Sequence, residues 1–102
     1  MSADLLKEFG ENYLLYFSHD SCSVCTVLKP KVEEMISGLF PKLNFHYIDI
    51  KDFPELAANY GVFTVPVVLV FFEKKEVIRK TRSFSVKELQ ESIERYYNLL
   101  FD

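Results

Sequence analysis

Residues 13–25 read YLLYFSHDSCSVC, and this stretch predicts the start of the fold together with a chemically reactive pair. The apolar run from Tyr13 to Phe17 is typical of a strand that is covered on both faces. A short polar loop follows it. Cys22 and Cys25, the two cysteines of the sequence, then stand where a helix is expected to begin. At this spacing the two thiols can interconvert between dithiol and disulfide with no further cysteine.

The position of each cysteine relative to the helix predicts its role. If Asp20 or Ser21 caps the helix, Cys22 lies at its first turn, where unpaired N–H groups and the positive end of the dipole favour an anion. We therefore expect the pKa of the Cys22 thiol to be lowered, which makes it the attacking nucleophile. Cys25 lies one turn further in, where we expect it to be less exposed and to resolve the mixed disulfide.

Composition indicates one folded domain over residues 1–102. Apolar residues make up 49% of the chain, including ten phenylalanines and six tyrosines, and the net charge of −3 gives no sign of a nucleic-acid surface. The longest apolar run, residues 65–72, is far shorter than the roughly 20 residues of a membrane span. The first residues lack the basic and apolar regions of a secretory signal, so we expect a cytoplasmic protein. A secreted form whose signal was removed is the alternative.

Apolar periodicity and turn residues predict the order α-β-α-β-α-β-β-α. The predicted ranges are 2–9, 13–17, 23–39, 45–50, 54–60, 67–72, 77–81 and 86–100. A capping box of Ser85 and Glu88 is expected to open the last helix. Early alternation followed by a hairpin predicts an α/β fold, with a mixed central sheet of four strands and helices on both faces. The cysteine pair then lies beyond the carboxyl end of the first strand, where ligands bind to such sheets.

Two prolines stand at informative positions. Pro30 falls inside the long helical pattern, where it removes an N–H group and favours a kink. Pro66 follows Thr64 and Val65 directly before a buried strand, where it gives up one ladder donor. Taken alone, Pro66 is expected to follow an ordinary trans peptide bond, which is much commoner than cis.

Together, the strand, the C-x-x-C pair, Pro30 and the segment around Pro66 resemble the thioredoxin-like family over almost the whole chain. The resemblance implies a thioredoxin fold, in which Cys22 attacks a disulfide and Cys25 resolves the intermediate. It further implies that Pro66 is a cis-proline facing the two cysteines and that the backbone of Val65 pairs with an extended substrate segment. Pro30 corresponds to the helix kink of the family.

The chain departs from the family pattern around this pair. Ser21 stands where the family has tryptophan, and Ser23 and Val24 replace its Gly-Pro between the cysteines. Tyr16 replaces a buried acidic residue, and Arg82 replaces a glycine after the last strand. The family's additional edge strand is also expected to be absent.

Three further side chains are candidate modulators or ligands of the pair. Tyr16 could hydrogen-bond near Cys25, but packing in the core is the favoured interpretation. His19 could lower the pKa of Cys22 as an imidazolium, although a solvated loop histidine is favoured. His46 is expected to be structural. The two histidines and two cysteines formally make a Cys₂His₂ set, but the histidines fall on different elements, so we expect no metal site.

These observations favour a thiol–disulfide oxidoreductase that reduces protein disulfides through Cys22 and Cys25. We expect it to act as a monomer on disulfide-containing proteins, with electrons from a reductase and no cofactor beyond the cysteine pair. Partners among nucleic acids and membranes are not expected. The alternative is a non-catalytic thioredoxin-fold adaptor or redox sensor that binds a partner segment beside Pro66.

Overall fold

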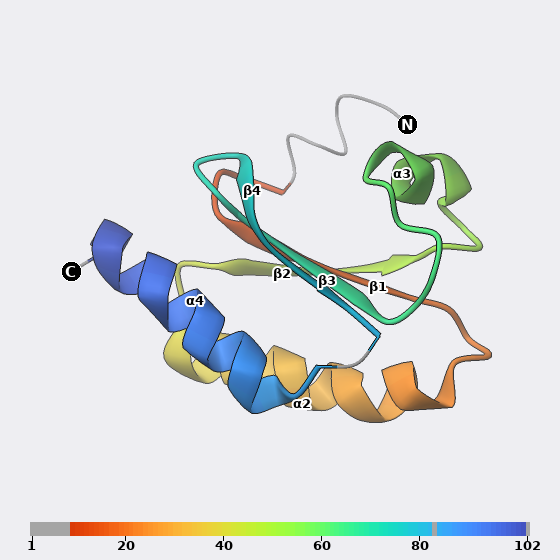
Figure 1. Cartoon of the computed structure of the whole chain (residues 1–102), viewed down its shortest axis with the longest axis horizontal. Helices are drawn as coiled ribbons and strands as arrows, with labels where there is room; N and C mark the ends of the chain where they lie inside the picture. The colour runs from red at the N-terminus through yellow and green to blue at the C-terminus, as the bar shows by residue number, and fades with distance from the viewer. Residues whose placement is uncertain (1–8, 83, 102) are drawn as a thin grey trace.

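The computed structural model describes residues 9–82 and 84–101. It contains strands β1 (Tyr13–Ser18), β2 (Asn44–Asp49), β3 (Val67–Phe72) and β4 (Lys75–Thr81), and helices α2 (Ser23–Leu39), α3 (Pro54–Asn59) and α4 (Val86–Phe101) (Figure 1). The predicted order is confirmed from the first strand onward. The helix predicted over residues 2–9 lies, except for Phe9, outside the described residues. Within those described ranges, no helix is long and apolar enough to cross a membrane.

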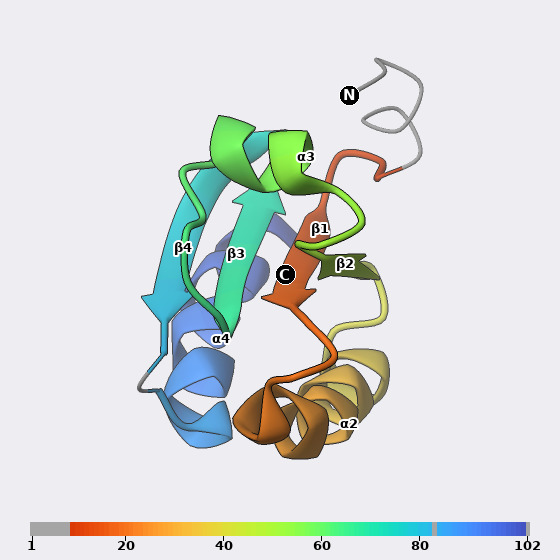
Figure 2. The same cartoon turned by 90° about the vertical axis from the view of Figure 1, so that its right-hand side faces the viewer.

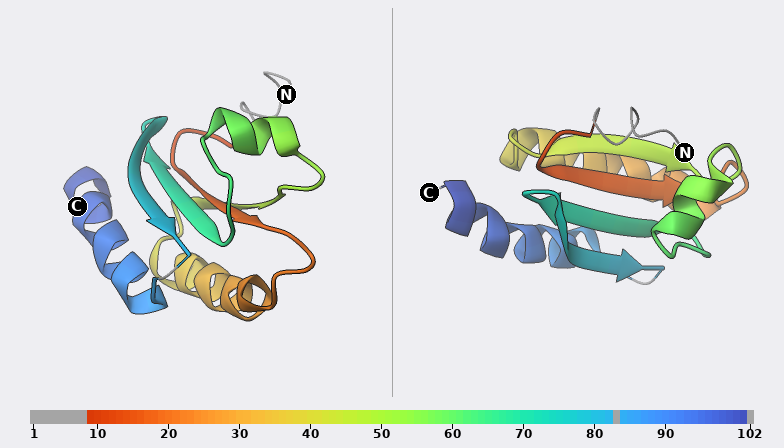
Figure 3. Two further views of the ribbon diagram at one scale, coloured as in Figure 1. Left: turned by 45° about the vertical axis from the view of Figure 1, so that its right-hand side comes forward. Right: turned by 90° about the horizontal axis from the view of Figure 1, so that it is seen from above.

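The strands form one mixed sheet in the order β2-β1-β3-β4 (Figure 3). Strand β1 pairs in parallel with β2 and antiparallel with β3, and β3 pairs antiparallel with β4. The central strands β1 and β3 are buried along their whole length. This explains their continuous apolar sequences, since both faces of each strand are covered. The predicted mixed sheet of four strands is confirmed.

Each face of the sheet carries its own core. Because successive side chains of a strand point to opposite faces, Leu14 and Tyr16 pack towards α2 and α4, whereas Leu15 and Phe17 pack towards α3. Figure 1 shows α2 and α4 on one side of the sheet and α3 on the other. The prediction of helices on both faces is therefore confirmed.

The hairpin between β3 and β4 is tighter than the sequence predicted. Glu73 and Lys74 both have left-handed backbone angles, with φ of 53° and 67°, as a two-residue turn requires. The Asn12 side chain accepts a hydrogen bond of 3.0 Å from the Glu73 N–H. Strand β4 therefore begins at Lys75, earlier than the predicted Val77.

Sheet register brings two distant loops together. Phe17, near the end of β1, lies opposite Val67, the first residue of β3. The loop that leaves β1 and the loop that enters β3 are thus at the same edge of the sheet. Figure 2 shows β1 leading from this edge into the start of α2. The cysteine pair and the segment around Pro66 consequently face each other.

Candidate active site

Helix α2 begins directly after the first cysteine of the pair. Cys22 is the N-cap residue, with extended backbone angles, and its Sγ accepts a hydrogen bond of 3.1 Å from the N–H of Cys25. Neither Asp20 nor Ser21 is the cap, because the helix begins at Ser23 and leaves Cys22 in the cap position. The Asp20 carboxylate is instead paired with Lys51 at 2.8 Å. No acidic residue occupies the first turn of this described helix. The Cys22 sulfur therefore accepts the N–H of Cys25 at the positive end of the helix dipole, which favours negative charge there.

The two cysteines form a disulfide and differ in accessibility. Their Cα atoms are 5.2 Å apart, within the usual range for a disulfide. Cys22 is partly exposed, whereas Cys25, in the first turn of α2, is completely buried in the core. An incoming sulfur atom can therefore approach Cys22 but not Cys25.

Tyr16 combines the two interpretations that the sequence left open. Its ring is fully buried in the core between the sheet and α2, as expected. Its hydroxyl also donates a hydrogen bond of 2.9 Å to the carbonyl oxygen of Cys25. Burial, with a smaller contribution from the neighbouring Tyr47, raises the pKa of Tyr16 to about 12. The Tyr16 hydroxyl is thus a neutral donor at physiological pH.

His19 lies in the loop before the cysteines. Its Nδ1 atom accepts a hydrogen bond of 3.1 Å from the N–H of Ser21, and its carbonyl accepts one of 3.2 Å from the N–H of Cys22. The loop is therefore held by backbone hydrogen bonds, and a role for His19 as an imidazolium beside Cys22 stays a prediction.

His46 is not brought to the site. It lies in the edge strand β2, and its ring packs 4.8 Å from that of Phe9, centroid to centroid. In the part of the chain that the structure describes, no three histidine, cysteine or acidic side chains come close enough to hold a metal ion. The four residues of the formal Cys₂His₂ set are thus not assembled.

The segment before β3 faces the disulfide with an unusual backbone. The peptide bond between Val65 and Pro66 is cis, as the family resemblance implied. Pro66 is buried, and its carbonyl accepts a hydrogen bond of 2.8 Å from the N–H of Arg82. Arg82 has a φ of 54°, a left-handed conformation that glycine adopts most readily. Among the described residues, no backbone group pairs with the N–H or carbonyl of Val65.

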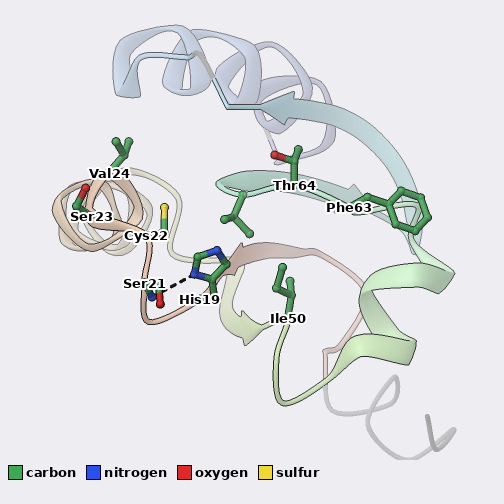
Figure 4. A pocket seen from close by; sticks show the side chains of 9 residues that line it. His19, Ser21, Cys22, Ser23, Val24, Ile50, Phe63 and Thr64 are labelled. Carbon is green, nitrogen blue, oxygen red and sulfur yellow. Dashed lines mark hydrogen bonds between the residues drawn. The ribbon is translucent and has the colours of Figure 1, made fainter.

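An open cavity of about 460 Å³ lies between the start of α2 and the loop that enters β3. Its lining comprises His19, Ser21, Cys22, Ser23, Val24, Ile50, Phe63, Thr64 and Val65 (Figure 4). The sequence predicted Cys22, Val65 and His19 near the site. It missed Ile50 and Phe63, which no motif marks. Phe63 could have been identified as a site candidate from its position, because it is an apolar side chain in the loop that enters the buried strand.

Comparison with known proteins agrees with this geometry. The family model for thioredoxin matches residues 3–95 of the chain. The chain belongs to the thioredoxin family. It is 32% identical to the thioredoxin-like protein YdfQ of Bacillus subtilis over 85 residues, which cover 83% of this chain and 75% of that protein. It is 33% identical to a thioredoxin of the same organism over 76 residues, covering 74% of this chain and 72% of that one.

A solved structure supports the family at the level of the fold. Thioredoxin 1 from Thermosipho africanus superposes with a TM-score of 0.81 at 32% identity, covering 88% of this chain and 99% of that one. This thioredoxin-family chain therefore has the thioredoxin fold with its cysteine pair at disulfide distance. A C-x-x-C disulfide on that fold supports thiol–disulfide exchange as the general chemistry of the site.

Proposed function

We propose that this protein reduces disulfide bonds of other proteins through Cys22 and Cys25. The observation that carries the proposal is the position of the Cys22 sulfur. It is partly exposed in an open cavity, and the N–H of Cys25 donates to it at the start of α2. Those surroundings stabilise a thiolate, so we expect the pKa of reduced Cys22 to lie below the roughly 8.5 of a free thiol.

The reaction proceeds in two exchanges. The Cys22 thiolate attacks one sulfur of the substrate disulfide, an Sγ–S bond forms, and the second substrate sulfur leaves as a thiolate that takes up a proton. Cys25 then loses its proton and attacks Sγ of Cys22, and the first substrate sulfur leaves as a thiol. The substrate gains two electrons and two protons, and the Cys22–Cys25 disulfide forms.

Burial separates the roles of the two cysteines. Because Cys25 is completely buried, it can reach only the sulfur of Cys22, to which it is bonded in this structure. It therefore resolves the mixed disulfide and does not begin an exchange with a second substrate. The Tyr16 hydrogen bond to the Cys25 carbonyl supports the first turn of α2 where this resolution takes place.

The segment around Val65 offers a place for the substrate backbone. Its N–H and carbonyl have no backbone partner within the described ranges, and the side chain lines the cavity beside Cys22. An extended substrate segment can pair with these groups as an added strand would. We assign substrate binding to Val65 and to the adjoining Pro66 on this ground.

Repeated turnover needs an electron donor and a reducing compartment. A separate reductase would return the pair to its dithiol form after each turnover, and no group beyond the two cysteines takes part. Reduction of disulfides suits a reducing compartment such as the cytoplasm.

Single cysteine variants test the proposal. With reduced protein and a disulfide-bonded protein substrate, Cys22→Ser should abolish exchange. Cys25→Ser should react once and accumulate the mixed disulfide, which mass spectrometry detects. The rate of Cys22 alkylation against pH should show a midpoint below about 8.5. No exchange by the wild-type protein, combined with an alkylation profile of an ordinary thiol, would contradict the proposal.

The adaptor alternative is separated by a double variant. A protein in which both cysteines are serine keeps the fold's binding surface but has no redox couple. If that variant restored the phenotype of a strain lacking the protein, binding alone would account for the function. Loss of restoration, with the variant still folded by circular dichroism, supports the reductase.

A further inference from the structure

We propose that Lys51 is a positioning residue for disulfide exchange, which holds the Asp20 carboxylate so that its charge does not oppose the thiolate of Cys22. The inference rests on the proposed function, because it concerns the reactive thiol of the same site. Lys51 stands outside the lining of the cavity and acts on the reacting sulfur through the loop that precedes it.

The loop between β1 and α2 is attached to the segment that follows β2. The N–H of Ile50 donates a hydrogen bond of 2.9 Å to the last carbonyl of β1. The next side chain reaches the loop itself, since Lys51 Nζ lies 2.8 Å from Asp20 Oδ1 and 3.3 Å from Ser21 Oγ. The Ser21 hydroxyl in turn donates a bond of 3.4 Å to Asp20 Oδ1. One ammonium group therefore holds the two residues that directly precede Cys22.

The Asp20 carboxylate is the negative charge closest to the reactive thiol in sequence. It stands two residues before Cys22, whose sulfur lies at the positive end of the α2 dipole. The first turn of this described helix contains no acidic residue, and the described lining of the cavity contains no aspartate or glutamate. An unpaired carboxylate beside a thiol raises the pKa of that thiol. Pairing with Lys51 cancels most of this effect, because the two opposite charges are in contact.

Both partners stay charged over the pH range in which a thiol titrates. The hydrogen bond from Lys51, together with its charge, holds the pKa of Asp20 below its usual value. The same contact raises the pKa of Lys51, with a smaller contribution from Asp49, whose Oδ1 accepts a hydrogen bond of 2.8 Å from the Lys51 N–H. Apart from Cys22, the titratable side chain in the described lining is His19, which is hydrogen-bonded within the loop. The loop that enters β3 brings no charged side chain to the described lining.

The exposure of the pair separates its effect on reactivity from its effect on stability. The side chains of Lys51 and Asp20 are 54% and 76% exposed. Ion pairs this exposed contribute little to the free energy of unfolding, so variants of either residue are expected to fold. A surface charge still acts over a Debye length of about 8 Å at physiological ionic strength. Two residues along a chain span at most about 7 Å, which places Cys22 within the range of Asp20.

The experiment measures the alkylation of reduced protein by iodoacetamide as a function of pH, with mass spectrometry to locate the label on Cys22. In Lys51→Ala the midpoint should rise by roughly half a pH unit, the effect of one charge about 7 Å away in water. Below the midpoint, the rate constant for exchange with a disulfide-bonded protein should fall about twofold, because a smaller thiolate fraction is partly offset by greater nucleophilicity. Lys51→Arg keeps the charge and should keep the wild-type midpoint.

A double variant distinguishes the charge of Asp20 from a change in the loop. Asp20→Asn in the Lys51→Ala background removes the uncompensated carboxylate, so the midpoint should return to its wild-type value. A salt concentration of about 1 M should shrink the difference between Lys51→Ala and the wild type.

Lys29→Ala is the matched control, because it also removes a lysine from an exposed ion pair. Lys29 lies 3.5 Å from Glu33 on α2. It stands about 10 Å along the helix from Cys22, beyond the Debye length of about 8 Å. The control should therefore leave the midpoint at its wild-type value.

The outcomes separate this inference from the proposed function. An unchanged midpoint in Lys51→Ala, with exchange by the wild-type protein intact, would overturn the inference alone. A raised midpoint that Asp20→Asn does not restore would also overturn it, because the effect would then come from the loop and not from the charge of Asp20. An equal rise in Lys29→Ala would do the same. Absence of exchange by the wild-type protein would overturn the proposed function and the inference together.

Discussion

The hydroxyl of Tyr16 can be removed with little change to anything else. Tyr16→Phe keeps the buried ring and deletes only the hydrogen bond of 2.9 Å to the Cys25 carbonyl. Because phenylalanine keeps the buried ring and only the oxygen atom is removed, the substitution opens no large cavity. The change in the free energy of unfolding therefore reports on this one bond.

The expected loss of stability depends on whether the Cys25 carbonyl keeps another hydrogen-bond partner. Cys25 lies inside α2, so its carbonyl keeps the amide partner that the helix provides and is not left unsatisfied. The expected loss is then the net value of one hydrogen bond, about 1 kcal/mol, and not the larger penalty of about 1–3 kcal/mol for an unpaired buried group. For a domain of this size, 1 kcal/mol corresponds to a decrease in melting temperature of about 4–8 °C.

Urea unfolding of the oxidised protein at pH 7 measures this loss. Tyr97→Phe is the matched control, because the Tyr97 hydroxyl accepts a hydrogen bond from the exposed N–H of Lys42. The control should change the free energy of unfolding by less than about 0.5 kcal/mol. An unchanged free energy in Tyr16→Phe, or a loss above about 3 kcal/mol with the same denaturant slope, would refute the reasoning about the retained helical partner.

Two further predictions concern alkaline pH and the left-handed backbone. Burial raises the pKa of Tyr16 from 10.0 to about 12, so its stabilising contribution is complete below pH 10 and is lost as the pH rises through 12, at about 1.4 kcal/mol per pH unit. The free energy of unfolding, measured by denaturant titration at each pH, should thus fall more steeply for the wild type than for Tyr16→Phe; parallel curves would contradict this. Arg82→Gly relieves a φ of 54° and should stabilise the fold by about 0.5–1 kcal/mol, after the greater entropy of unfolded glycine is subtracted. Arg82→Ala, which keeps the left-handed cost, should gain nothing in the same urea titration, and equal gains in both variants would point to the arginine side chain.

Much of the fold could be predicted because its signals are local. The range of α2 was predicted correctly from the stripe of apolar residues with helical spacing, and β3 from its unbroken apolar run. Errors occurred where a few residues in a turn set the boundary. The hairpin turns at Glu73 and Lys74, which both adopt left-handed backbone angles. Glycine is the usual sequence signal for such angles, and neither position is a glycine.

The sequence by itself determined the reactive pair, since two cysteines at this spacing before a helical pattern restrict the chemistry. It also determined which strands are buried on both faces. Only the tertiary structure decided that the Tyr16 hydroxyl reaches the Cys25 carbonyl and that Phe63 stands exposed in the same cavity as Cys22. The physical reason is that exposure and hydrogen-bond partners depend on strand register, which pairs β1 with β3 across a long stretch of chain. The apolar periodicity within a single strand or helix does not indicate which strand it pairs with or in what register.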